Sequence, residues 1–167
     1  MTVPQGSLPA GYALRPATPA DAPAVARQRA QMFVDMDTLT PEAAAQEVPL
    51  WTDWLRGALA SGEYVGLLTE WEGTVVGGAG LMVFPKMPTL ADPATQKGHI
   101  LNVSVDPAHR RRGLAESLME ATLEEVRARG LRQITLNAAP MGRPIYERLG
   151  FVESAHPELR LTLEPPA

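Results

Sequence analysis

Residues 100 to 130 carry a strand pattern, a turn and a helix pattern in one uninterrupted stretch. The run ILNVSV is apolar and β-branched, as expected of a strand, and the turn DPAHRRR follows it. After Gly113, apolar or small side chains recur at the 3.6-residue spacing of a helix that Gly130 ends: Ala115, Leu118, Met119, Thr122 and Val126. A strand that leads directly into a helix predicts a layered fold in which helices pack on a sheet.

The start of this predicted helix is suited to an anion. The first backbone N–H groups of a helix have no intrahelical acceptor, and the helix dipole places roughly +0.5 charge at that end. Gly113 and the small Ala115 let a phosphate approach the backbone, and the arginines 110–112 supply forked donors around it. The alternative is that the three arginines form a solvated charge cluster on a surface turn. The agreement of strand, glycine and amphipathic helix favours the phosphate site.

The three arginines are a local feature of an acidic chain. The 167 residues include 15 Lys and Arg against 19 Asp and Glu, for a formal net charge of -4. A protein that binds nucleic acid by general electrostatics is usually basic throughout. We therefore expect no nucleic-acid partner, and salt-sensitive binding of DNA or RNA is kept as the contrasting hypothesis.

The remaining composition excludes several other classes of site. Without cysteine the chain can form no disulfide, thiolate nucleophile or cysteine-based metal centre, and its three histidines, His99, His109 and His156, lack metal-ligand spacing. No stretch approaches the ~20 apolar residues of a membrane span, and the N-terminus lacks a signal pattern. We expect a cytoplasmic protein with no metal and no membrane partner.

Residues 1–11 contain two prolines and two glycines among small residues, which predicts a flexible leader before one domain over residues 12–167. Two helix starts show a Thr-Pro-x-acid or Thr-Pro-acid pattern, at Thr18 and at Thr40. The patterns predict these elements in order: a strand over 12–17, helices over 18–33 and 40–60, two strands within 63–84 that turn at Glu72 and Gly73, a loop over 85–98, a strand over 99–105, a helix over 113–130, a strand over 132–139, a short helix over 142–150 and a final strand over 158–164.

The run Arg110 to Ala115 resembles the RxxGxA form of the pyrophosphate loop in GNAT-type (Gcn5-related) N-acetyltransferases. The VSV strand before it, the run IYERLGF downstream and the order of elements from Tyr12 to Leu163 strengthen the resemblance, which covers nearly the whole chain. It implies an α/β (α+β) fold with a mixed, mostly antiparallel twisted sheet flanked by helices. In that fold the strand ending at Val105 and the strand over 133–138 run parallel and splay apart around the cofactor.

The resemblance also implies the reaction: transfer of an acetyl group from acetyl-CoA to a primary amine by direct attack in a ternary complex. Backbone groups of Val103 and Val105 would bind the pantetheine arm as an added strand. Arg110 fills the family's Gln/Arg position, and Asn137 is carried over as a cofactor contact, because Pro140 stands where the family has asparagine. Backbone amides would cradle the pyrophosphate at Arg111, Arg112, Gly113, Leu114, Ala115 and Glu116.

Two residues are the candidates for proton transfer. Tyr146 matches the family's tyrosine that protonates the departing thiolate, while an aromatic residue on a short helix can equally belong to the core. His99 stands where histone-type members have a glutamate base; it can accept a proton near neutral pH or be a strand-end histidine bonded to a loop. Glu70 and Glu72 are other candidates for the base, and strand alternation places Asn102 on the face opposite His99.

The resemblance leaves the acceptor open: a peptide N-terminus, a lysine, a polyamine, an antibiotic or a metabolite. Residues 31–55 and the loop over 85–98 would form its surface. Their apolar side chains either line an acceptor cleft or belong to the core, namely Met32, Phe33, Met36, Trp51 and Trp54. A non-catalytic acyl-CoA-binding sensor or partner-binding module is the alternative function, and a homodimer through exposed strand edges is plausible in such a family.

Overall fold

The structure, a computed structural model, describes residues 8–156 and 158–163. It contains a five-stranded sheet in the order β1-β2-β3-β4-β5. The strands are β1 (Tyr12–Pro16), β2 (Tyr64–Trp71), β3 (Thr74–Pro85), β4 (Gln96–Val105) and β5 (Ile134–Leu136). The first four strands pair antiparallel, whereas β4 and β5 run parallel. This confirms the mixed, mostly antiparallel sheet that the sequence predicts.

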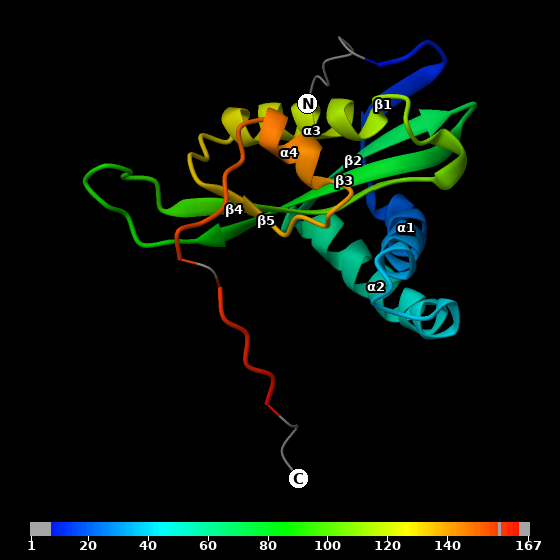
Figure 1. The fold of residues 1–167 in the computed structure, drawn as a ribbon, viewed down its shortest axis with the longest axis horizontal. Coiled ribbons are helices and arrows are strands. Elements are labelled where there is room, and N and C mark those ends of the chain that lie inside the picture. Colours follow the sequence, from blue (N-terminus) through cyan, green and yellow to red (C-terminus); the bar gives the residue numbers. More distant parts are fainter. Residues whose placement is uncertain (1–7, 157, 164–167) are drawn as a thin grey trace.

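Helices cover both faces of this sheet (Figure 1). One face carries α1 (Ala22–Asp35) and α2 (Pro41–Ser61), and the other carries α3 (Leu114–Ala128) and α4 (Arg143–Arg148). Short 3-10 turns, η1 (Pro19–Asp21) and η2 (Pro107–His109), precede α1 and the loop before α3. The cores on the two faces are separate. Leu55 of α2 packs with Tyr64 and Leu68 of β2 on one face, whereas Met119 of α3 packs with Leu81 and Ile100 on the other.

The second helix begins as its sequence predicts, whereas Thr18 caps the 3-10 turn η1 and α1 begins only at Ala22. Thr18 and Asp21 form a capping box, and Asp21 also accepts two hydrogen bonds of 2.8 Å from Arg15, which hold the pKa of its carboxyl well below the usual range. Thr40 caps α2 by accepting a 3.2 Å hydrogen bond from the backbone of Ala43. This second helix is continuous, since α2 runs past Pro49 without a break.

A tight hairpin joins β2 to β3, as predicted. Glu72 and Gly73 occupy its two turn positions with φ of 49° and 75°, the left-handed pair that a type I′ turn requires. The next connection is shorter than the predicted loop over 85–98, because β3 continues to Pro85 and β4 begins at Gln96. The backbone N–H of Lys86 donates to Thr95 (2.8 Å) and thereby closes this second hairpin.

A bulge in β4 shapes the region between β4 and β5. Gly78 pairs with Ser104 and Gly80 with Leu101, so Ala79 lies opposite both Asn102 and Val103. Asn102 adopts a left-handed backbone conformation with φ of 54°, which asparagine tolerates better than most residues. On its other side β4 pairs with β5 only over residues 98–100, so the two parallel strands part just before the bulge.

The predicted buried stripe of α3 is confirmed in its main positions. Leu118, Met119, Thr122 and Val126 are buried against the sheet, while Ala115 is half-buried at the start of the helix. Full burial of a side chain such as Leu118 contributes about 1.5 to 3 kcal/mol. Gly130 follows α3 with φ of 67°, as expected of a glycine that ends a helix. The helix that carries the arginine loop is therefore firmly fixed to the sheet.

Both ends of the chain differ from the prediction. Residues 1–7 of the proposed leader lie outside the described residues, but Leu8 packs against two core clusters, so the leader is not loose over its whole length. The predicted last strand is wrong over residues 158–163, which form no strand and extend away from the sheet (Figure 1). Three leucines alternate in this segment and are exposed: Leu159, Leu161 and Leu163. Such alternation produces a strand only where a neighbouring strand is available to pair with the segment.

Candidate active site

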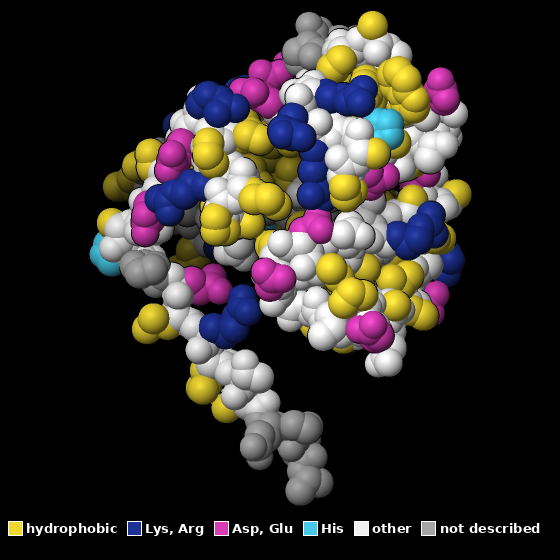
Figure 2. All heavy atoms as spheres, turned by 45° about the vertical axis from the view of Figure 1, so that its right-hand side comes forward, with side chains coloured by type: hydrophobic (Ala, Val, Ile, Leu, Met, Phe, Trp, Pro, Cys, Tyr) yellow, Lys and Arg dark blue, Asp and Glu magenta, His cyan; other side chains and the backbone are white. Residues whose placement is uncertain are grey.

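A large cleft of about 990 Å³ opens where β4 and β5 part. Its walls come from α1, β4, the loop before α3, the first turn of α3, the end of β5 and α4. Figure 2 shows hollows on this side of the molecule in which hydrophobic side chains lie between dark blue basic ones. The cleft brings together these predicted site residues: His99, Val103, Val105, Arg110, Arg111, Gly113, Leu114, Ala115, Glu116, Asn137 and Tyr146. Arg112 is the predicted site residue that does not line it.

The loop before α3 has the geometry of an anion site. Arg111 and Gly113 both have positive φ, 60° and 80°, so the backbone turns sharply just before Leu114 begins the helix. A Cβ built on Gly113 would meet nothing within 4 Å, which shows that this backbone faces open space. Left-handed conformations alternating with right-handed ones direct successive N–H groups to one side, and the helix dipole adds to their effect.

The side chain of Arg110 is engaged within the protein. Its Nε donates to the carbonyl of Val105 (2.8 Å), and its Nη2 contacts the carboxylate of Asp35 at the end of α1. Two of its donors are thus committed to holding the loop against β4 and α1. The same bond occupies the carbonyl of Val105, whereas Val103 lies in the part of β4 that β5 does not cover.

Tyr146 packs against the core and also faces the cleft. Its ring packs against the cluster under α3 and meets Phe151 edge-on, with 6.2 Å between the ring centroids. It also lines the cleft, and among the described residues its hydroxyl has no hydrogen-bond partner. Burial raises the pKa of this phenol, so the hydroxyl keeps its proton at neutral pH.

His99 lies in the middle of β4, and its Nδ1 is 2.9 Å from the hydroxyl of Thr135 on β5. The alternative of a strand-end histidine bonded to a loop is therefore wrong. Burial lowers the pKa of His99, Lys97 acts in the same direction, and Glu158 opposes them. The imidazole is thus mainly neutral at pH 7 and available to accept a proton.

The two glutamates considered as bases lie elsewhere. Glu70 accepts a 2.8 Å hydrogen bond from Arg15, and Glu72 occupies the turn between β2 and β3. Neither lines the cleft. The carboxylates that do line it belong to Asp35, which contacts Arg110, and Glu116, which pairs with Arg148 at 3.2 Å.

The face assigned to Asn102 by strand alternation is wrong. His99 pairs with Met82, and both Met82 and Leu101 belong to the α1 and α2 side of the sheet. The bulge turns Asn102 to that same side, where its amide donates to the buried hydroxyl of Tyr64 (3.2 Å). Alternation fails here because the bulge inserts one extra residue into the strand.

Arg29 on α1 is a site residue that sequence reasoning missed. Its Nη1 donates to the side-chain oxygen of Asn102 (2.5 Å), and its guanidinium lies over the rings of Phe33 (4.6 Å) and Trp51 (5.0 Å). Burial lowers the pKa of this guanidinium. The available signal was a charged residue on the same helical face as Val25, Ala26 and Phe33.

Some of the apolar residues expected to line an acceptor cleft do so. Met32, Phe33 and Met36 line the cleft, whereas Trp51 packs against the core under α1 and α2. Trp54 is 47% exposed and packs edge-on against Tyr64 instead. The loop over residues 86–95 takes no part in the cleft, because the β3–β4 hairpin carries it away (Figure 1).

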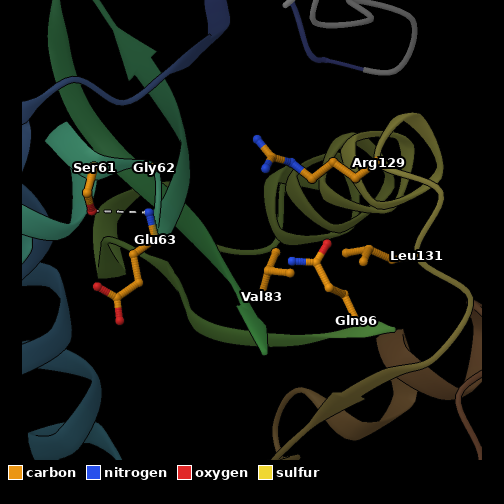
Figure 3. A pocket seen from close by; sticks show the side chains of 7 residues that line it. All are labelled: Ser61, Gly62, Glu63, Val83, Gln96, Arg129 and Leu131. Carbon is orange, nitrogen blue, oxygen red and sulfur yellow. Dashed lines mark hydrogen bonds between the residues drawn. The ribbon is translucent and has the colours of Figure 1, made fainter. Parts of the chain in front are cut away.

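A second hollow of about 560 Å³ lies at the end of α2 (Figure 3) and shares no lining residue with the cleft. The Ser61 hydroxyl accepts a 3.4 Å hydrogen bond from the backbone of Glu63, and Arg129 is paired with Glu125 at 2.7 Å. Its charged side chains therefore do not converge on a common point.

In the described part of the chain no group of three or more His, Asp or Glu side chains is arranged to hold a metal ion. Among the same residues no helix has the length and apolarity to cross a bilayer.

Comparison with known proteins agrees with this geometry. The sequence model of the acetyltransferase (GNAT) family matches residues 30–151. The crystal structure of a GCN5-related N-acetyltransferase from Ralstonia eutropha JMP134 is similar with a TM-score of 0.81 and 34% identity, over 90% of this chain and 99% of that one. A predicted acetyltransferase from Clostridium acetobutylicum, solved with acetyl-CoA, shares the fold with a TM-score of 0.81 and 23% identity, over 90% and 96% of the two chains.

Among curated proteins, the chain is 39% identical over 79 residues to a glucosamine 6-phosphate N-acetyltransferase of Trypanosoma brucei brucei, which is 47% of this chain and 52% of the relative. It is also 39% identical over 56 residues to glucosamine 6-phosphate N-acetyltransferase 1 of rice, 34% of each chain. The aligned part thus spans about half or less of these two curated relatives.

Proposed function

The chain belongs to the acetyltransferase (GNAT) family, and on that premise we propose that it transfers an acetyl group from acetyl-CoA to a primary amine. The observation that carries the proposal is the continuity of one cleft from the Gly113 loop, along the uncovered part of β4, to Tyr146 and His99. An anion site, an exposed strand edge and two groups able to move protons are what this reaction needs.

The loop and β4 would hold acetyl-CoA. The backbone N–H groups from Arg111 to Glu116 would bind the pyrophosphate at the start of α3, where the left-handed turn at Gly113 leaves room. The pantetheine arm would add to β4 beside Val103, where β5 leaves the strand edge uncovered. Because the carbonyl of Val105 already accepts from Arg110, Val103 would supply more of this pairing, and Asn137 would contribute from the other side of the gap.

His99 would remove the proton from the attacking amine. The hydroxyl of Thr135 also approaches the carbonyl of Gly98 (3.5 Å), which can only accept. With its proton directed there, Thr135 accepts from Nδ1–H of His99, and Nε2 is left with a free lone pair. A neutral imidazole in this tautomer can take the amine proton directly or through a water molecule.

Tyr146 would complete the reaction. The amine nitrogen attacks the thioester carbonyl, the carbon–sulfur bond breaks, and the departing thiolate takes the phenolic proton. Burial keeps the phenol protonated before this step, and an unpartnered hydroxyl is free to donate. The N-acetyl product and CoA then leave with all protons accounted for, since the proton on His99 can return to Tyr146 through solvent.

The acceptor class is suggested by the curated relatives. Two of them are named as glucosamine 6-phosphate N-acetyltransferases, so this amino sugar phosphate is the first acceptor to test. A single domain over residues 12–167, a cytoplasmic location and a homodimer stay predictions of the sequence.

Release of free thiol from acetyl-CoA in the presence of a panel of amines tests the proposal. Time-dependent release with at least one amine supports it; binding of acetyl-CoA without release with any amine contradicts it. The latter result would favour a non-catalytic acyl-CoA-binding module. One observation speaks for that alternative, namely that both carboxylates lining the cleft are engaged by arginines and leave no acidic base.

A further inference from the structure

Arg29 is a half-buried cation without an anionic partner. Its one hydrogen bond among the described residues goes to the neutral amide of Asn102, and no described carboxylate forms an ion pair with it. Arg15, in contrast, binds two carboxylates at 2.8 Å. Removing a guanidinium from water without a counter-charge costs free energy, which an anion in the cleft would recover.

The side chain of Arg29 is held in place from three sides. Phe33 and Trp51 lie against the guanidinium with 4.6 and 5.0 Å to their ring centroids. Asn102 accepts from Nη1 and is itself fixed by its bond to the hydroxyl of Tyr64, a phenol whose pKa burial raises to about 12. The group is thus oriented before any ligand arrives, and most of its five N–H donors remain available.

Of the five arginines that line the cleft, two are paired with carboxylates, and Arg160 belongs to the exposed segment after α4. The remaining two, Arg111 and Arg29, lie on opposite walls. Near the start of α3, Arg111 lies beside the Gly113 loop, where the proposed function places the pyrophosphate. Arg29 lies on the opposite wall, on α1, and contacts the face of β4 that also carries His99. The cleft therefore offers a second cationic group on the side where the amine would be deprotonated.

We propose that Arg29, oriented by Asn102, binds an anionic group of the acceptor, so that the substrate is an amine that also carries a carboxylate or a phosphate. The inference rests on the proposed function and narrows it to anionic amines. A guanidinium fork matches either oxyanion in a bidentate arrangement. Its position on the wall that carries His99 would direct the amine of such a molecule toward the base.

Matched pairs of acceptors test this in the thiol-release reaction. One pair is glucosamine 6-phosphate with glucosamine, and the other is an amino acid with its carboxamide. We expect kcat/KM to be about tenfold or more higher for the charged member of one pair, and the pair that responds tells phosphate from carboxylate. Equal rates for charged and neutral members of both pairs would overturn the inference.

Variants on α1 supply the residue-level test. R29Q should raise KM for the charged acceptor about tenfold or more while kcat/KM for its neutral counterpart changes little. R29K should keep part of the preference, because it retains the charge without the fork. R27Q removes an exposed arginine two positions away and should match the wild type. Equal losses for both acceptors in R29Q would mean a purely structural role.

An independent measurement separates the inference from the proposed function. With CoA present at saturation, inorganic phosphate or acetate should raise the Tm of the wild type and of R27Q, but not of R29Q. If the protein shows this thermal shift but releases no thiol with any amine, the proposed acetyl transfer is contradicted and the anion site at Arg29 is supported. The absence of any shift in the wild type, together with turnover of neutral amines only, would overturn the anion site and retain the transferase.

Discussion

Arg110 contacts the carboxylate of Asp35, a residue that lies 75 positions earlier in the chain. The contact joins the end of α1 to the loop before α3, and Nε of the same arginine binds the carbonyl of Val105. Arg110 therefore spans the two walls of the cleft. We propose that its side chain acts as a positioning residue that holds the loop before α3 in place.

We predict that Arg110→Met and Asp35→Asn weaken acetyl-CoA binding by similar amounts, about threefold to tenfold, because either change releases the loop. The coupling energy in the double variant should be about 1 kcal/mol for this partly exposed pair. Isothermal titration with acetyl-CoA measures the four affinities. A normal affinity in Asp35→Asn together with a large loss in Arg110→Met would show that Arg110 binds the phosphates directly.

Gly113→Glu should abolish the rise in Tm that acetyl-CoA causes, since the new carboxylate enters the space where the pyrophosphate would lie. Gly130→Glu is the matched control, because Gly130 also has positive φ and also has no atom within 4 Å of a built Cβ, but it lies outside the cleft. Both variants should lose about 1 kcal/mol of stability from backbone strain. If both keep their response to acetyl-CoA, the loop assignment fails.

Tyr146→Phe should lower kcat by about 10² or more and leave the affinity for acetyl-CoA nearly unchanged, because only the donated proton is lost. The ring contact with Phe151 is preserved, so the Tm should change little. Steady-state kinetics and titration with acetyl-CoA provide the two readouts. Full activity in this variant would return Tyr146 to a packing role alone.

The pH profile of kcat/KM should report His99. Burial lowers its pKa, so activity should rise with pH through a midpoint below the usual value of about 6.5 and be level by pH 7 to 8. The same shift predicts that the contribution of His99 to folding stability is present above about pH 6.5 and is lost as the pH falls through the lowered folded pKa.

Replacing His99 with Gln should reduce kcat and should remove the rise of kcat/KM with pH on the acidic side of the profile, the acidic limb. Thr135→Val removes the Nδ1 partner while keeping the shape of the side chain, and should reduce kcat by a smaller factor, about threefold to tenfold. An unchanged acidic limb in His99→Gln would mean that another group is the base.

The sequence predicts most of the frame because its signals there are local. Periodicity places α3, and the positive φ of Gly113 and Gly130 is what glycine allows at the two ends of that helix. The threonine caps place the starts of η1 and α2. Each of these features depends on residues within one or two turns of each other.

The parts that the sequence does not predict depend on distant residues. The bulge at Asn102 is defined by the partner strand β3, and it reverses the face on which that side chain lies. Arg29 becomes a site residue only because Asn102, 73 positions later, is turned toward it. The leucines near residue 160 alternate as in a strand, but pairing needs a neighbour that the short β5 does not supply.

The cleft is divided between elements that are separate in the chain: α1 forms one wall, and the Gly113 loop with α3 forms the other. In the proposed function the cofactor half would rely mainly on backbone groups, whereas the α1 wall presents side chains. A redesign can therefore exchange positions such as Met32, Phe33 and Met36 to retarget the enzyme while the donor machinery stays as it is. The fold thus separates a constant cofactor-binding half from an acceptor-binding half whose side chains can be changed independently.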